Sequence, residues 1–61
     1  MKIIFNPAAP RGQQYTIVHD DGRVTLNVAQ SCVLGTLQAS GRSIRQANIE
    51  VAAAKVAATA S

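Results

Sequence analysis

The chain has little of what usually stabilises a small protein. It contains one cysteine, Cys32, and one histidine, His19, so it has no pair for an internal disulfide and no Cys/His set for a structural zinc. Its aromatic residues are limited to Phe5 and Tyr15. A chain of 61 residues without such supports lies near the lower size limit for independent folding, which leaves oligomerisation as the expected support.

Catalytic motifs are also absent. The carboxylate side chains are Asp20, Asp21 and Glu50, and the first two lie at a predicted turn rather than as a catalytic pair. We expect Cys32 to be a buried small hydrophobic residue rather than a nucleophile. The segment Gly41-Arg42-Ser43 lacks the glycine spacing and the lysine of a phosphate-binding loop. The sequence therefore predicts a protein that is not an enzyme and that uses no metal or cofactor.

The sequence contains no hydrophobic run long enough to span a membrane. Asn6-Pro7 ends the first apolar stretch, and polar residues interrupt the uncharged segment Val24–Gly41. The net charge is +3, but the positive residues are spread out and form no basic arm. This balance is compatible with an anionic partner without requiring one. A lone thiol and no visible export signal favour a cytoplasmic location, with no membrane partner.

The first half of the chain carries strand signals. Lys2–Phe5 reads as a short strand, and two prolines and a glycine make a loop of the next seven residues. Tyr15–Val28 reads as a hairpin, because Asp21-Gly22 is a preferred two-residue turn between two strand-like runs.

The two-residue turn fixes an expected register. It places Asp20 opposite Arg23, Ile17 opposite Leu26, and Tyr15 opposite Val28. Since opposed residues share a face of the sheet, the apolar and polar residues separate. The expected inner face carries Tyr15, Ile17, Val24, Leu26 and Val28. The expected outer face carries Thr16, Val18, Asp20, Arg23, Thr25 and Asn27.

The segment from Ala29 to Ala39 allows two interpretations. Apolar residues at Ala29, Val33 and Leu37 recur at four-residue intervals, which favours a short helix. Gly35 and the β-prone pair Cys32-Val33 weaken this helix, and a strand over Ser31–Gln38 is the alternative. The helix is the preferred prediction.

The C-terminal segment Ser43–Ala60 predicts a long helix with two apolar sides. Ser43 and Gln46 have the spacing of a capping box, and alanine gives high helix propensity. One apolar stripe, suited to covering the sheet, consists of Ile44, Ala47, Val51, Ala54 and Ala58. A second stripe, nearly opposite, consists of Ile49, Ala53, Val56 and Ala60. Because one small sheet covers one stripe, we expect the second to form an interface with another copy or with a larger protein.

These elements predict a single small α+β domain over residues 1–61. A small antiparallel sheet, formed by the hairpin Tyr15–Val28 and the N-terminal strand, is expected to pack on one or two helices. The surplus apolar helix surface indicates a homodimer or higher oligomer.

The region Arg23–Ala60 also resembles the ribbon-helix-helix DNA-binding proteins. In that family a strand pairs across a dimer, its alternate polar residues read bases in the major groove, and the second helix begins at a phosphate. The resemblance implies base contacts from Arg23, Thr25 and Asn27, and a phosphate contact from Ser43. Two features depart from the family: the strand has a partner within its own hairpin, and the first helix is shorter.

Three functions follow in order of preference. The first is a non-enzymatic binding protein, an inhibitor or adaptor that self-associates and docks on a larger protein, as free-standing chains of this size often do in phages and mobile elements. The second is the dimeric DNA-binding protein just described. The third is a binder of a small anionic ligand near Arg42, Ser43 and Arg45, where a capped helix begins beside two positive charges.

Overall fold

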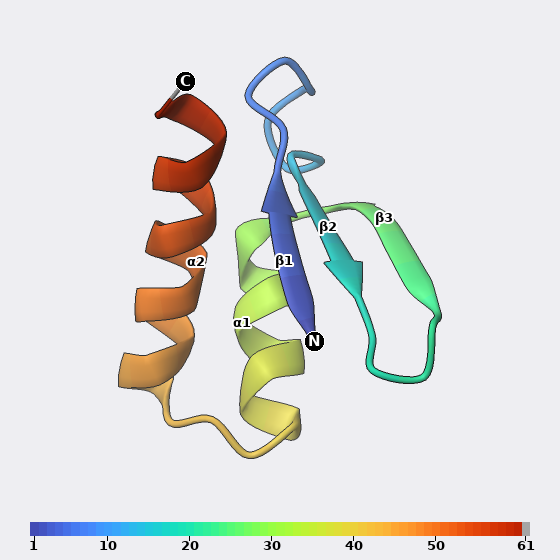
Figure 1. Ribbon diagram of the computed structural model, residues 1–61, viewed down its shortest axis with the longest axis vertical. Helices are drawn as coiled ribbons and strands as arrows, with labels where there is room; N and C mark the ends of the chain where they lie inside the picture. The colour runs from blue at the N-terminus through green and yellow to red at the C-terminus, as the bar shows by residue number, and fades with distance from the viewer. Residues whose placement is uncertain (61) are drawn as a thin grey trace.

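A computed structural model describes residues 1–60 of the chain. It contains three strands and two helices, which confirms the predicted α+β class (Figure 1). The elements are β1 (Lys2–Phe5), β2 (Tyr15–Val18), β3 (Val24–Val28), α1 (Gln30–Ala39) and α2 (Ile44–Thr59).

The sheet is antiparallel in the order β1-β2-β3. The expected N-terminal strand is β1, and the predicted hairpin is formed by β2 and β3. Lys2 pairs with Val18 and Phe5 with Tyr15. The ladder extends one step beyond the strands, because the Asn6 N–H donates to the Gln14 carbonyl at 2.7 Å. This pair closes the base of the loop that connects β1 to β2.

The hairpin turn differs from the expected two-residue loop. The His19 N–H donates to the Arg23 carbonyl at 2.8 Å, which leaves Asp20, Asp21 and Gly22 as a three-residue loop. A two-residue loop of this kind needs positive φ at both positions, whereas here only Gly22 adopts it, at +90°. The prediction that Asp20 pairs with Arg23 is therefore wrong.

Asp21 helps to stabilise the three-residue loop. Its carboxylate accepts the Arg23 N–H at 3.0 Å and pairs with the Arg23 Nε at 2.7 Å. These bonds from the Arg23 backbone and side chain lower the pKa of Asp21 below its ordinary value. Asp20 pairs instead with the N-terminal ammonium of Met1.

The register of β3 changes along its length. Near the turn Val18 pairs with Val24 and Ile17 with Thr25, one residue away from the expected register. A bulge then restores the expected pair of Tyr15 and Val28. Asn27 lies in this bulge with a φ of +59°, which asparagine tolerates better than most residues.

The changed register reverses the predicted faces of β3. Val24 and Leu26 were expected beside Ile17, but they lie on the outer face and are 53% and 65% exposed. Thr25 was expected outside, but it is opposite Ile17 on the inner face and half-buried. Tyr15 and Val28 keep their predicted inner positions, since their pair is common to both registers.

The ambiguous segment is helix α1, as preferred. It ends in a Schellman motif, in which the Arg42 N–H donates to the Leu37 carbonyl and the Gly41 N–H to the Gln38 carbonyl. Gly41 supplies the positive φ of +104° that this motif requires. Helix α2 begins as predicted, because the Ser43 hydroxyl accepts the Gln46 N–H at 3.1 Å.

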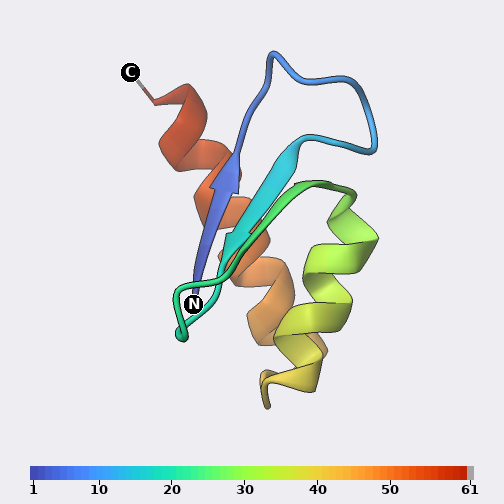
Figure 2. The same cartoon turned by 90° about the vertical axis from the view of Figure 1, so that its right-hand side faces the viewer.

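The helices form one layer against the inner face of the sheet. Helix α2 packs on β1 and on α1, and α1 packs on β2, so β3 is the strand farthest from the helical layer (Figures 1 and 2). The core contains Phe5, Tyr15, Ile17, Val33, Leu37, Ala47 and Val51. The expected sheet-covering stripe of α2 supplies two of these, but its first member, Ile44, is 52% exposed. Ile44 begins the helix and lies beyond the sheet-facing part of α2.

Candidate functional site

The second stripe of α2 is exposed along its whole length. Ile49 is 55% and Val56 63% exposed, and Ala53 and Ala60 are exposed with them. The intervening Val51, which faces the core, is 4% exposed. The predicted interface residues thus form a continuous apolar surface that the chain itself does not cover.

The outer face of the sheet is a second apolar surface that the sequence did not predict. Ile4, Val24 and Leu26 are each at least 43% exposed, and the half-buried Val18 lies in the same row as Val24. Val18 was expected on this face, and the three-residue turn adds Val24 and Leu26 to it. We refer to Ile4, Val18, Val24 and Leu26 as the outer sheet patch.

The three residues proposed to read DNA bases do not share one face. Arg23 is bound to Asp21 at the turn, and Asn27 lies in the bulge. Thr25 faces inward, where its hydroxyl and His19 Nε2 share a hydrogen bond of 2.9 Å. The bulge therefore breaks the alternation of polar residues on which the ribbon-helix-helix resemblance depends.

The start of α2, predicted to hold an anion, is occupied by the chain's own groups. Ser43 caps the helix, and Arg42 pairs with Glu50 at 2.9 Å and with the Ser40 hydroxyl at 2.8 Å. Arg45 is exposed on the first turn. The groups expected to bind an anion are thus largely engaged already.

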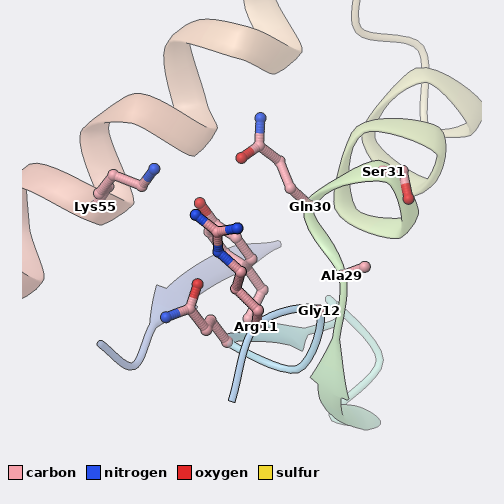
Figure 3. Close-up of a pocket in the computed structure, with 8 residues that line it drawn as sticks. Arg11, Gly12, Ala29, Gln30, Ser31 and Lys55 are labelled. Carbon is pink, nitrogen blue, oxygen red and sulfur yellow. The ribbon is translucent and has the colours of Figure 1, made fainter. Parts of the chain in front are cut away.

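A different site lies at the start of α1. A cavity of about 460 Å³ opens where the β1–β2 loop, α1 and α2 meet. Arg11, Gln30 and Lys55 extend their polar ends toward a common space (Figure 3). The cavity is lined by Arg11, Gly12, Gln14, Tyr15, Ala29, Gln30, Ser31 and Lys55.

Two local features place the cations. The Gln13 N–H donates to the Pro10 carbonyl at 3.0 Å, and Gly12 has a φ of +81°, so Arg11 occupies a tight turn. Lys55 extends from α2, with its ammonium 5.5 Å from the centre of the Phe5 ring. The two positive charges thus come from segments far apart in the sequence.

One residue that lines the cavity, Tyr15, carries an unsatisfied group. Tyr15 is 3% exposed, and its hydroxyl is buried without a hydrogen-bond partner among the described residues. Burial raises the pKa of this phenol above its ordinary value, so it remains a protonated donor at neutral pH. A buried donor without an acceptor is costly and uncommon.

The first turn of α1 completes the arrangement. Its N-cap is Ala29, which makes no side-chain capping hydrogen bond. The Cys32 N–H already donates to the Ala29 carbonyl at 3.1 Å, so the N–H groups of Gln30 and Ser31 are the ones at this helix start that a ligand can use. This site was not predicted from the sequence. Its one local sign in the sequence is an alanine directly before a helix, and nothing in the sequence shows that Arg11 and Lys55 come close to it.

Cys32 is exposed on α1, and the prediction that it is buried is wrong. It precedes Val33 in the helix, and it is Val33 that takes the core position.

Between Met1 and Ala60, no helix is long and apolar enough to cross a membrane. Comparison with protein-family models, with curated proteins and with solved structures finds no match for this chain.

Proposed function

We propose that the protein is a non-enzymatic binding protein that self-associates and docks on a larger protein, as an inhibitor or adaptor does. The observation that carries this proposal is the exposure of its large apolar side chains. Six of them lie outside the core: Ile4, Val24, Leu26, Ile44, Ile49 and Val56. Among the described residues the core also contains six large apolar side chains, so as many bulky apolar residues face outward as fill the centre.

The second stripe of α2 is the surface we assign to self-association. Ile49, Ala53, Val56 and Ala60 follow the alternating four- and three-residue spacing of a coiled-coil seam. Alanine at two of these positions lets two helix axes approach closely. Because a two-fold axis brings the same stripe of both copies together, one stripe serves both sides of the interface.

The outer sheet patch is the surface we assign to the larger partner. It lies on the face of the sheet opposite the helices, so a dimer formed through α2 leaves it free (Figure 2). Its residues are aliphatic, which suits an apolar protein surface better than a nucleic acid. The DNA-binding alternative has less support, since Arg23, Thr25 and Asn27 are not on one face.

Light scattering across a concentration series tests the self-association. We expect a mass above that of one chain for the natural protein, and a monomer mass for the double variant Ile49→Asp/Val56→Asp. The matched control is Asn48→Asp, which adds a carboxylate to an exposed position of α2 outside the stripe. A monomer at all concentrations for the natural protein would refute self-association through α2.

A further inference from the structure

The cavity at the start of α1 has a composition that fits one kind of ligand. It presents a guanidinium, an ammonium, two amide side chains and the first turn of a helix, and none of the residues that line it is acidic. We propose that this cavity binds a small oxyanion, a phosphate or carboxylate group carried by a small molecule. The site is distinct from both apolar surfaces assigned to protein binding.

The charges of the chain support this assignment. Its three acidic side chains are engaged elsewhere: Asp20 with the N-terminal ammonium, Asp21 with Arg23, and Glu50 with Arg42. No acidic side chain is therefore left to neutralise Arg11 or Lys55. Two cations beside one cavity, neither paired with an acidic group of the described residues, create a local positive potential that attracts an anion.

The Tyr15 hydroxyl is the independent sign of a missing acceptor. It belongs to a residue that lines the cavity, it is buried, and no described group accepts its proton. Since the phenol is protonated at neutral pH, it needs an oxygen to which it can donate. An oxyanion in the cavity supplies such an oxygen, whereas a cation or an apolar ligand does not.

The start of α1 adds backbone N–H donors beside the cavity. Helix N-termini bind anions because their first N–H groups point outward and the helix dipole is positive there. At α2 the Ser43 hydroxyl takes this place, but Ala29 at α1 has no side-chain oxygen to offer. The uncapped helix therefore starts beside two cations that form no ion pair within residues 1–60, and the capped one starts beside the Arg42–Glu50 pair.

The volume bears on the size of the ligand. About 460 Å³ lies within the range of small-molecule sites and exceeds the volume of an inorganic phosphate. Gly12 and Ala29 are among the lining residues, and no atom lies within 4 Å of where a Cβ of Gly12 would be. The site thus has room for an organic group attached to the oxyanion.

Amide chemical shifts measured by NMR test the proposal with two probes, inorganic phosphate and citrate, at low ionic strength. We expect saturable shifts at Gly12, Gln30 and Ser31 with at least one probe. A stronger response to phosphate identifies a phosphate-bearing ligand, and a stronger response to citrate a carboxylate. Arg11→Met and Lys55→Met should each weaken binding roughly tenfold, because each removes a charge-assisted hydrogen bond.

Tyr15→Phe is the most specific variant. It removes an unsatisfied hydroxyl and keeps the ring, so the ligand-free protein should remain folded, with an unchanged or slightly higher melting temperature. Binding of the probe should nevertheless weaken roughly tenfold. Arg45→Met is the matched control, because it removes the same charge from an exposed residue that does not line the cavity.

Three results would overturn the proposal. They are the absence of shifts with either probe at millimolar concentration, binding that Tyr15→Phe and Arg11→Met leave unchanged, and binding that is lost in Arg45→Met instead. The last result would move the site to the start of α2. None of them bears on self-association, which is measured by mass and is altered by different residues.

Discussion

Helices α1 and α2 are adjacent in the sequence and packed on each other, yet they are stabilised by different means. Helix α1 has no charged residue and no side-chain cap at its start. It depends on Val33 and Leu37, which are fully buried. Its structure therefore comes mainly from the surface it packs against.

Helix α2 shows the opposite balance. It begins with a Ser43 cap, it is rich in alanine, and Glu50 ties it to Arg42 in the preceding loop. Its buried residues are smaller, Ala47 and Val51. The comparison shows that a helix formed largely by its own sequence can leave a whole side uncovered, whereas α1 depends on its buried face.

The largest test of this contrast replaces one large apolar residue in each helix. Leu37→Ala should lower the free energy of unfolding by about 2–5 kcal/mol, because Leu37 is fully buried. Ile49→Ala should change it by about 0.5 kcal/mol or less in dilute solution, since Ile49 is largely exposed. Urea unfolding measures both. Equal losses in the dilute monomer would show that the two helices are not stabilised differently.

The cap of α2 gives the next largest effect. Ser43→Ala should lower the free energy of unfolding by about 1 kcal/mol, because the Gln46 N–H loses its acceptor. Ser43→Asp is the control and should restore most of the loss, since aspartate caps equally well. Thermal unfolding followed by circular dichroism measures both variants. An unchanged Ser43→Ala protein would mean that packing alone sets the start of α2.

Gly35 provides a smaller effect of opposite sign in α1. It lies inside the helix without positive φ, and a Cβ there would meet no atom within 4 Å. Gly35→Ala should therefore raise the free energy of unfolding by about 0.5–1 kcal/mol. Urea unfolding at neutral pH measures the gain. A loss of stability would mean that something covers this face of α1 in solution.

The smallest effect concerns the ion pair that anchors α2. Glu50→Gln should cost about 0.2–1 kcal/mol, because Arg42 and Glu50 are both partly exposed. The loss should shrink at high salt, which screens such pairs. Unfolding at two salt concentrations checks this point. A cost that does not respond to salt would indicate a packing role for Glu50 instead.

The sequence predicted the elements better than their relations. Helical spacing, the Ser43 cap and the Asp21-Gly22 turn signal gave the right class and the right order of elements, because these are local preferences. The register of β3 was missed, since the choice between a two-residue and a three-residue loop depends on small differences in turn energy. One residue in the turn then reversed the faces of Val24, Thr25 and Leu26.

The candidate sites also differ in whether local sequence patterns or tertiary contacts define them. The exposed stripe with Ile49 and Val56 was predictable, because helical periodicity alone places both residues on one side. The cavity was not, since Arg11, Tyr15 and Lys55 meet only through the tertiary arrangement. The buried hydroxyl of Tyr15 has no signature in the sequence at all.

The bulge at Asn27 has a consequence for how the hairpin tolerates change. The observed pairing and the regular one share the pair of Tyr15 and Val28 and differ only in where the surplus residue sits. If Asp20 joined β2, the bulge would disappear, and Val24 and Leu26 would rotate toward the helices while the start of α1 stayed in place. A shift in the register of β3 would therefore not move the connection to α1. For the same reason, deleting one residue at the bulge would make β3 a regular strand without displacing the rest of the molecule.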